Sequence, residues 1–326
     1  MKDRSGALDA VTVVVPTRNR SQTLRQSLHS VLGQQDVELS VVVVDDASTD
    51  DTREIVHNLS GVRLIRHDRP TEQRIARNHG ASSATTPWLA FCDDDDLWAP
   101  TKLRRQLDAA TASGGDWCTA SALHVDEDLV PIGGERLSDP QDLFRHLLHR
   151  NVVPGGGSGV LVRRALFDQV GGFDDSARFV EDWDLWIRLF QHGRVACVDE
   201  LLVAYRQWSR SFSHNAFDNQ YAAFRALTNR FSGDESIEDQ KPQRSSAFEV
   251  RQRLRSEGRV SVAKDLPRLI HRDPADTIPM LLMLGLPNPL LTELRLRRLG
   301  MDEVERADAW LAPYRLAVND PSVSFQ

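Results

Sequence analysis

The sequence has few cysteines and no long apolar run. Its three cysteines, Cys92, Cys118 and Cys197, are far apart and form no C-x-x-C pair, which argues against a disulfide framework and a zinc-binding cysteine cluster. The first ten residues are charged and lack the apolar segment of a secretory signal. The longest apolar stretch, residues 279–291, is too short to cross a bilayer and is broken by prolines. We therefore expect a protein of the reducing cytoplasm with no transmembrane segment.

An excess of basic residues is also missing. Lys and Arg total 40 against 47 Asp and Glu, which gives a net charge of −7 and disfavours a general electrostatic grip on nucleic acid. Hydrophobic residues make up 40% of the chain and charged residues 27%, proportions that exclude disorder and fibrous repeats. The composition predicts a globular protein with a sizeable core.

The apolar residues alternate between strand and helix periodicity. Val11–Val15 and Leu39–Val44 are β-branched runs typical of strands buried on both faces of a parallel sheet, and Ser21–Leu32 between them has apolar residues at helical spacing. The alternation continues through the strand Trp88–Cys92 and predicts a doubly wound α/β sheet of nucleotide-binding type. Further strands are expected at residues 62–65, 117–120, 160–162, 195–198 and 201–205, and helices at 51–59, 72–83, 101–112, 141–149 and 181–191.

The last third of the chain differs in composition. Residues 232–246 are polar with Gly and Pro and predict a linker between an α/β domain, residues 1–231, and a helical subdomain, residues 247–326. Nine leucines between residues 281 and 299 give too much apolar surface for a solvated helix. We expect the protein to bury this surface within the monomer or in a homodimer. The alternative is peripheral docking on the inner face of a membrane, with neighbouring arginines on anionic lipid.

Four consecutive aspartates, Asp93–Asp96, directly follow the predicted strand Trp88–Cys92. Like charges so close raise one another's pKa, and a divalent cation would compensate them. Mg²⁺ or Mn²⁺ typically takes one or two carboxylates and completes its shell with phosphate oxygens and water. An EF-hand loop does not fit, because Trp98 stands where that loop needs Gly. The alternative interpretation is a solvated acidic turn that caps the next helix.

The first two predicted strands also end in polar residues. PTRNR, residues 16–20, follows the first strand and DDASTD, residues 45–50, ends the second, and ligands of open α/β sheets bind at the carboxyl ends of strands. No G-x-G-x-x-G turn follows the first strand, so the dinucleotide-binding mode is excluded. A carboxylate such as Asp46 can accept hydrogen bonds from a base or ribose. Asp46 can equally cap the helix that follows.

A second acidic pair, Glu181 and Asp182, opens a predicted helix beside Trp183 and Trp186. The helix dipole favours ionised carboxylates at this end, so structure alone can explain the pair. Two tryptophans near a carboxylate would also form a platform for a sugar ring beside a general base. The residues alone leave both interpretations open.

Together these segments resemble a family 2 glycosyltransferase of the GT-A fold. The resemblance covers residues 11–213 and rests on the ordered motifs VTVVVPTRNR, VVVVDDASTDDT, ARNHG, FCDDDDLWAPTKL, GVLVRRALFDQVGGFD and EDWDLWIRL. It implies a metal-dependent, inverting transfer of a sugar from a nucleotide-sugar donor, which we expect to be a UDP-sugar, to a hydroxyl of a glycan, lipid-linked or small-molecule acceptor. It divides the first domain into a nucleotide-sugar-binding half, about residues 10–120, and an acceptor-binding half, about residues 121–231.

The resemblance also implies roles for individual residues. Asp95 matches the main metal ligand, with Asp94 beside it, for Mn²⁺ or Mg²⁺. Asp182 matches the base that deprotonates the acceptor hydroxyl, with Glu181 and Trp183 in contact with substrate. The remaining matches are expected to bind the nucleotide: Pro16, Thr17, Arg18, Asp46, Arg77, Asn78, Asp93 and Asp94.

Two positions depart from the family pattern. Many members carry a His three residues after the Tyr that ends the late strand, whereas Tyr205 is here followed by Trp208 at that spacing. His214 is expected to replace the missing metal ligand. The usual Gly before ARNHG is absent, and Arg74 near that place is expected to contact the base or a phosphate. The loops that choose the acceptor are expected at residues 125–139 and 155–159.

Two other functions compete with this one. A sugar-phosphate nucleotidylyltransferase would need a Gly-rich loop with a Lys after the first strand, which PTRNRS lacks. A non-catalytic module that only binds nucleotide or glycan would have no need of Asp95 and Asp182 together.

Overall fold

A computed structural model describes residues 9–137, 139–141, 143, 147, 151–208, 223, 226, 227, 230, 231 and 288–319. The chain divides into two compact units, one formed by Met1–Ser209 with Leu296–Gln326 and the other by Arg210–Arg295. The first unit contains the sheet and every site residue discussed below. The expected linker, the greater part of the expected helical subdomain, most of the helix expected at 141–149, and His214 lie outside the described residues.

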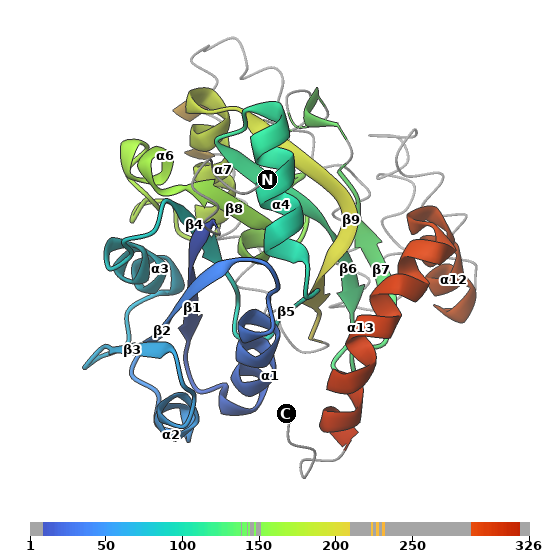
Figure 1. Cartoon of the computed structure of the whole chain (residues 1–326), viewed down its shortest axis with the longest axis horizontal. Helices are drawn as coiled ribbons and strands as arrows, with labels where there is room; N and C mark the ends of the chain where they lie inside the picture. The colour runs from blue at the N-terminus through green and yellow to red at the C-terminus, as the bar shows by residue number, and fades with distance from the viewer. Residues whose placement is uncertain are drawn as a thin grey trace, which may run out of the picture. The chain divides into compact units, whose positions relative to one another are not determined.

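The described strands form one mixed sheet of nine, in the order β3-β2-β1-β4-β8-β6-β9-β5, with β7 paired to β6 (Figure 1). The four strands from β3 to β4 are parallel, as expected, and β8 joins them antiparallel. Their bounds are β1 (Ala10–Thr17), β2 (Glu38–Asp45), β3 (Val62–Arg66), β4 (Trp88–Phe91), β5 (Leu97–Trp98), β6 (Trp117–Val125), β7 (Pro131–Glu135), β8 (Val160–Arg163) and β9 (Val195–Arg206).

Helices cover both faces of this sheet. The side chains of α1 (Ser21–Leu32), α2 (Thr52–His57) and α4 (Lys102–Ser113) join one core cluster with the strands. The opposite face carries α3 (Gln73–Ser82), α6 (Arg164–Gln169) and α7 (Glu181–His192), because Phe167 of α6 meets Phe91 of β4 and Trp186 of α7 stacks on Trp117 of β6. A sheet with helices on both faces needs apolar residues in consecutive strand positions, which explains the unbroken β-branched runs.

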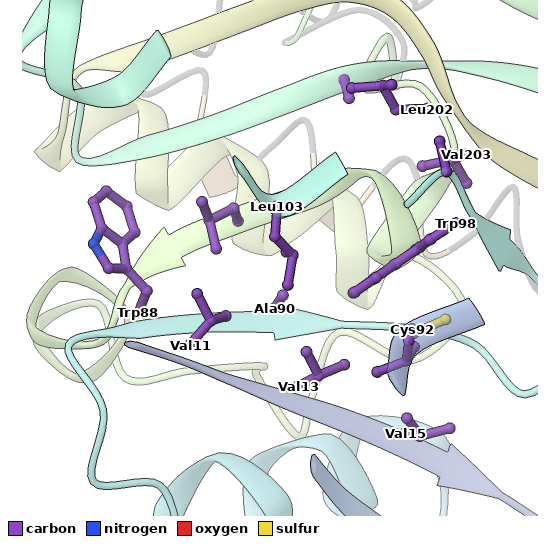
Figure 2. Packing of buried hydrophobic residues seen from close by; sticks show 14 of the residues in the cluster. Val11, Val13, Val15, Trp88, Ala90, Cys92, Trp98, Leu103, Leu202 and Val203 are labelled. Atoms are coloured by element: carbon purple, nitrogen blue, oxygen red, sulfur yellow. The ribbon is translucent and has the colours of Figure 1, made fainter. Parts of the chain in front are cut away.

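Figure 2 shows how the strands and helices meet in the first of these clusters. Val11, Val13 and Val15 project from β1 toward the α4 side, and alternate residues of β4 project with them. Trp98 and Leu103, which lie beside them, are completely buried. The segment just after the acidic run is therefore anchored in the core, and the four aspartates are held between two fixed elements.

Three strands differ from the sequence-based expectation. The two strands expected between residues 195 and 205 are one strand, β9, whose register with β6 shifts near Ser121. Such a bulge adds a residue without ending the strand, and no Gly or Pro marks it. The two residues of β5 and the Gly-containing β7 are too short or too weakly apolar to stand out in the sequence.

The last described helix packs on the sheet. α13 (Met301–Asn319) lies against β9 (Figure 1), and Val304, Ala307 and Leu311 are buried with Leu97 and Leu123. The first unit thus includes residues well beyond the boundary expected at 231. Among the described residues, no helix combines the length and apolarity needed to span a membrane.

Gly80 packs α3 directly against β1 and β2. A Cβ at this position would lie 2.3 Å from Cγ1 of Val14 and 3.0 Å from Cγ2 of Val44. Both valines are buried strand residues that have little room to move. The Gly of ARNHG therefore sets the distance between this helix and the sheet.

Gly80→Ala should lower the free energy of unfolding by about 1–2 kcal/mol, because overpacking outweighs the usual helix-propensity gain of Ala over Gly. Urea denaturation followed by circular dichroism measures the change. Ser82→Ala, at an exposed position of the same helix, is the control and should change stability by about 0.5 kcal/mol or less. A Gly80→Ala variant as stable as wild type would contradict the close packing.

Candidate functional site

The four aspartates after β4 point to different partners. Asp96 is fully buried, and Oδ2 accepts a hydrogen bond from Ser158 Oγ at 2.6 Å while Oδ1 accepts one from the Arg206 backbone N–H at 3.0 Å. Burial, with repulsion from Asp95 and Asp93, raises the pKa of Asp96 well above its ordinary value. Asp96 thus links the end of β4 to the glycine-rich turn and to the end of β9, and its role is structural.

Asp94 and Asp95 form the part of the run that faces β1. Thr17 Oγ1 donates to Asp94 Oδ2 at 2.7 Å, and the half-exposed Arg20 forms ion pairs with Asp95 and, at 3.5 Å, with Asp94. Trp208 Nε1 donates to Asp95 Oδ2 at 2.8 Å. Trp208 stands where many members of the resembled family have His. It therefore contacts Asp95, the expected metal ligand, through its indole N–H.

The carboxylates of Asp94 and Asp95 repel each other. Burial and the charge of Asp95 raise the pKa of Asp94 to about 7, although Arg20 and Thr17 act in the opposite direction. The pair is therefore short of positive charge. Among the described residues, no group of three or more Asp, Glu, His or Cys side chains is arranged to hold a metal ion. Two carboxylates fit Mn²⁺ or Mg²⁺ only if phosphate oxygens and water complete the shell.

Asp93 and Asp182 are joined by Arg77. Arg77 Nη2 donates to Asp93 Oδ1 and Nη1 donates to Asp182 Oδ1, each at 2.6 Å. Asp93 follows β4 and Asp182 lies in the first turn of α7, so one α3 side chain connects two elements that are about 90 residues apart in the chain. Gln73 Nε2 also donates to Asp93 Oδ1 at 2.9 Å.

Asp182 is more basic than an ordinary aspartate. Burial raises the pKa of Asp182 to about 6; Arg77 lowers it, whereas Asp93 and Glu181 raise it. A carboxylate with a pKa just below neutrality is ionised at pH 7 and is a stronger base than an ordinary surface aspartate. Oε2 of the neighbouring Glu181 is buried and accepts no hydrogen bond from the described residues.

The glycine-rich turn is packed against these groups. Gly155 and Gly156 have positive φ angles of 66° and 52°, and a Cβ at Gly157 would lie 3.0 Å from Arg77 Nη2. Ser158 Oγ accepts a hydrogen bond from the Asp93 backbone N–H at 3.0 Å in addition to the one it donates to Asp96. The sequence predicted a variable acceptor loop at 155–159; in the structure this turn supports Arg77 and the aspartates.

Asp46 lies beside Thr17, because the Asp46 N–H donates to the Thr17 carbonyl at 2.9 Å. The Asp46 carboxylate accepts hydrogen bonds from Thr71 N–H and Oγ1 and from His67 Nδ1, all between 2.7 and 2.9 Å. Burial acts to raise the pKa of Asp46, but these hydrogen bonds outweigh it and leave the pKa below its ordinary value. His67 in turn contacts the ring of His79.

Other predicted nucleotide contacts have structural partners. Asn78 Nδ2 donates to the Phe173 carbonyl at 2.7 Å and Oδ1 accepts from the Phe173 N–H at 2.9 Å. Arg74 pairs with Glu72 and donates to the Asp175 carbonyl at 3.1 Å. These contacts occupy both side chains away from the aspartates of the site. Pro16 is a buried residue of β1, and Arg18 is exposed just after it.

Trp183 and Trp186 do not form the sugar-binding platform that the sequence suggested. Trp186 is fully buried and stacks on Trp117, and Trp183 is only 8% exposed, with its Nε1 donating to the Leu147 carbonyl. The helical period explains both positions, since residues three apart on α7 share the face that packs on the sheet. Little of either ring is left for a sugar.

Sequence reasoning missed five contributors: Arg20, Gln73, Ser158, Arg206 and Trp208. Arg20 ends the PTRNR motif and could have been assigned from its place after β1. Ser158 could have been found as the polar residue inside GGGSG. Arg206 acts on Asp96 through its backbone, for which the side-chain pattern holds no signal.

The chain is similar in sequence and fold to known glycosyltransferases. Residues 12–171 match the model of glycosyl transferase family 2. The succinoglycan biosynthesis protein ExoO of Rhizobium meliloti is 33% identical over 193 residues, 54% of this chain and 54% of ExoO, so the match spans about half of that relative. A PGL/p-HBAD biosynthesis glycosyltransferase of Mycobacterium bovis is 31% identical over 187 residues, 56% of this chain and 70% of the relative.

Solved structures support the fold. TarS 1–349 of S. aureus in complex with UDP has a TM-score of 0.56 at 17% identity, over 97% of this chain and 93% of that chain. TarS in complex with UDP-GlcNAc has a TM-score of 0.54 at 19% identity, over 90% and 89%. These matches show the expected GT-A fold. The family model and the 31% identity over most of a glycosyltransferase's length show that this chain belongs to glycosyl transferase family 2.

Proposed function

We propose that this glycosyltransferase moves a sugar from a UDP-sugar to a hydroxyl of a glycan, lipid-linked or small-molecule acceptor, with inversion of configuration and with Mn²⁺ or Mg²⁺. The observation that carries the proposal is the convergence of Asp94 and Asp95 with Asp182 at the carboxyl edge of the sheet, linked by Asp93 and Arg77. Relatives named for succinoglycan and teichuronic acid synthesis support a glycan acceptor. The UDP and UDP-GlcNAc complexes of TarS support a uridine donor.

The chain's residues have distinct tasks in this reaction. Asp46, kept ionised by its hydrogen bonds, would accept an N–H of the base, and Thr17 holds Asp94 beside it. Asp182 takes the proton of the acceptor hydroxyl. At the same time the hydroxyl oxygen bonds to the anomeric carbon, and the bond from that carbon to the diphosphate breaks. Attack from the opposite face inverts the configuration, and no covalent enzyme intermediate forms.

Asp95, with Asp94, would hold the divalent cation. Such an ion supplies Lewis-acid neutralisation of the charge that develops on the departing diphosphate. Their carboxylates fit this task because Arg20, the cation that pairs with both, is half-exposed and can turn away. The donor class can be tested directly by a thermal-shift panel of UDP-, GDP- and dTDP-sugars with Mn²⁺, in which a selective UDP-sugar shift is expected.

Asp95→Ala should abolish the metal-dependent part of nucleotide binding. The remaining carboxylates are directed to Thr17, Arg77 and Ser158 and are poorly placed for the same ion. Isothermal titration of UDP with Mn²⁺ and with EDTA measures this effect, and wild type should lose affinity by about 10-fold or more without metal. Asp168→Ala, an exposed aspartate on α6, is the matched control. Equal UDP affinity of wild type in Mn²⁺ and EDTA would refute metal dependence.

Asp182→Asn should keep donor binding but lower transfer by on the order of 10²-fold or more, because the amide cannot accept the proton. UDP release from the donor selected by the panel, with water as acceptor, measures turnover, and UDP titration measures binding. If the Asn variant turns over at the wild-type rate, Glu181 becomes the first alternative base. A wild-type chain that binds UDP-sugar but releases no UDP with any acceptor would instead favour a binding module.

The pH profile should report the same carboxylate. Asp182 is active as the ionised base, so the rate at saturating donor should be full above its pKa and fall as the pH drops through about 6. Because Asp94 also titrates near neutrality, UDP affinity must be measured at each pH to separate binding from turnover. A saturated rate that stays flat from about pH 7 to about pH 5 would contradict a base of raised pKa.

A further inference from the structure

Arg77 is enclosed by the site. The residue is 1% exposed, and its Nη1 and Nη2 atoms are used by Asp182 and Asp93. Two of its five N–H donors are thus committed to carboxylates, its Nε–H has no partner among the described residues, and almost none of the side chain is exposed to a ligand. The position that the family resemblance assigned to nucleotide binding is therefore occupied by an internal bridge.

The surroundings fix the orientation of this bridge. The Arg77 guanidinium carbon lies 5.2 Å from the centroid of the Phe173 ring, and the backbone of Phe173 is held by two hydrogen bonds with Asn78. Gly157 also packs closely on the guanidinium, since a Cβ there would lie 3.0 Å from Nη2 and would require the guanidinium to shift. Motif residues on α3 and in the glycine-rich turn thus serve to hold one guanidinium.

We propose that Arg77 is a positioning residue for glycosyl transfer, which fixes the base Asp182 relative to the donor-side Asp93 and keeps it in its ionised form. The inference deepens the proposed function and rests on the assignment of Asp182 as the base. It assigns Arg77 no direct contact with the nucleotide. The α3 helix then connects the donor half of the site to acceptor activation through a single side chain.

The charges around Asp182 favour this role. Asp93 after β4, Glu181 on α7 and the Tyr205 ring on β9 face it, together with the Gly157 N–H. Arg77 is the cation in this set and lowers the pKa of Asp182, whereas burial, Asp93 and Glu181 raise it. Loss of the cation would raise this pKa further. A base with a higher pKa is protonated over a wider range, so the acid limb of the rate profile should move to higher pH.

Arg77→Met and Arg77→Lys, assayed from about pH 5 to 9 for UDP release from the UDP-sugar that the thermal-shift panel selects, test the proposal. For Met we expect the acid limb to move up by about one pH unit or more, while the Kd of UDP with Mn²⁺ changes by about 3-fold or less. For Lys we expect a limb near that of wild type but a kcat about 10-fold lower, because one ammonium cannot bridge both carboxylates. Arg104→Met, which removes an ion-paired arginine of α4, should behave as wild type.

A UDP affinity weakened by about 10-fold or more, with the acid limb unmoved, would overturn the proposal and make Arg77 a nucleotide contact. If Arg77→Met does not fold, the Arg77→Lys variant tests the proposal. A lower kcat at unchanged UDP affinity supports a positioning role, whereas a weaker UDP affinity at unchanged kcat refutes it. The Asp182→Asn variant separates a failure of the base assignment from a failure of the role proposed for Arg77. Wild-type turnover of that variant refutes the base itself, whereas an inactive Asn variant beside an unaltered Arg77→Met refutes only the role of Arg77.

Discussion

The structure depends on the neutralisation of crowded carboxylates by a few arginines. Four aspartates follow β4, and Asp182 approaches them from α7, in surroundings that raise the pKa of three of the five. Isolated charges in such a place would be too costly to bury. Arg77 joins Asp93 to Asp182 and Arg20 joins Asp94 to Asp95. The helices and turns around the site are arranged so that these two guanidiniums reach their partners.

The two arginines balance charge in different ways. Arg77 is buried and held by Phe173 and the glycine turn, so its removal would leave two carboxylates without a counter-ion. The side chain of Arg20 is 46% exposed, and water can take over its hydrogen bonds at small cost. In the proposed reaction a divalent cation and a diphosphate would therefore displace Arg20 from Asp95, whereas the Arg77 bridge would persist. The counter-ion of Asp94 and Asp95 is therefore exchangeable, whereas the counter-ion of Asp93 and Asp182 is fixed.

Much of this arrangement follows from the sequence. The β-branched runs predicted the parallel strands, and the rule that ligands bind at strand ends placed Thr17, Asp46 and the acidic run at one edge. What the sequence could not supply is the partner of each side chain. Asn78, Trp183 and Gly157 stand in motif-like segments, yet they brace Phe173, fill the core and make room for Arg77. The chemical type of a side chain limits which interactions it can make, but burial and distance decide whether its partner is a ligand or a neighbouring residue.

Hydrogen bonding divides the carboxylates by task. Asp46 accepts several hydrogen bonds from Thr71 and His67 and has a lowered pKa, so it keeps its charge and orientation, as recognition of a neutral base edge requires. Asp94 and Asp182 have pKa values raised to about 7 and about 6. A carboxylate that must gain a cation or a proton during the reaction benefits from this incomplete stabilisation, because the stabilising interaction then comes from the substrate complex. In the proposed reaction the same residue type would therefore serve recognition at the end of β2 and chemistry after β4 and in the first turn of α7.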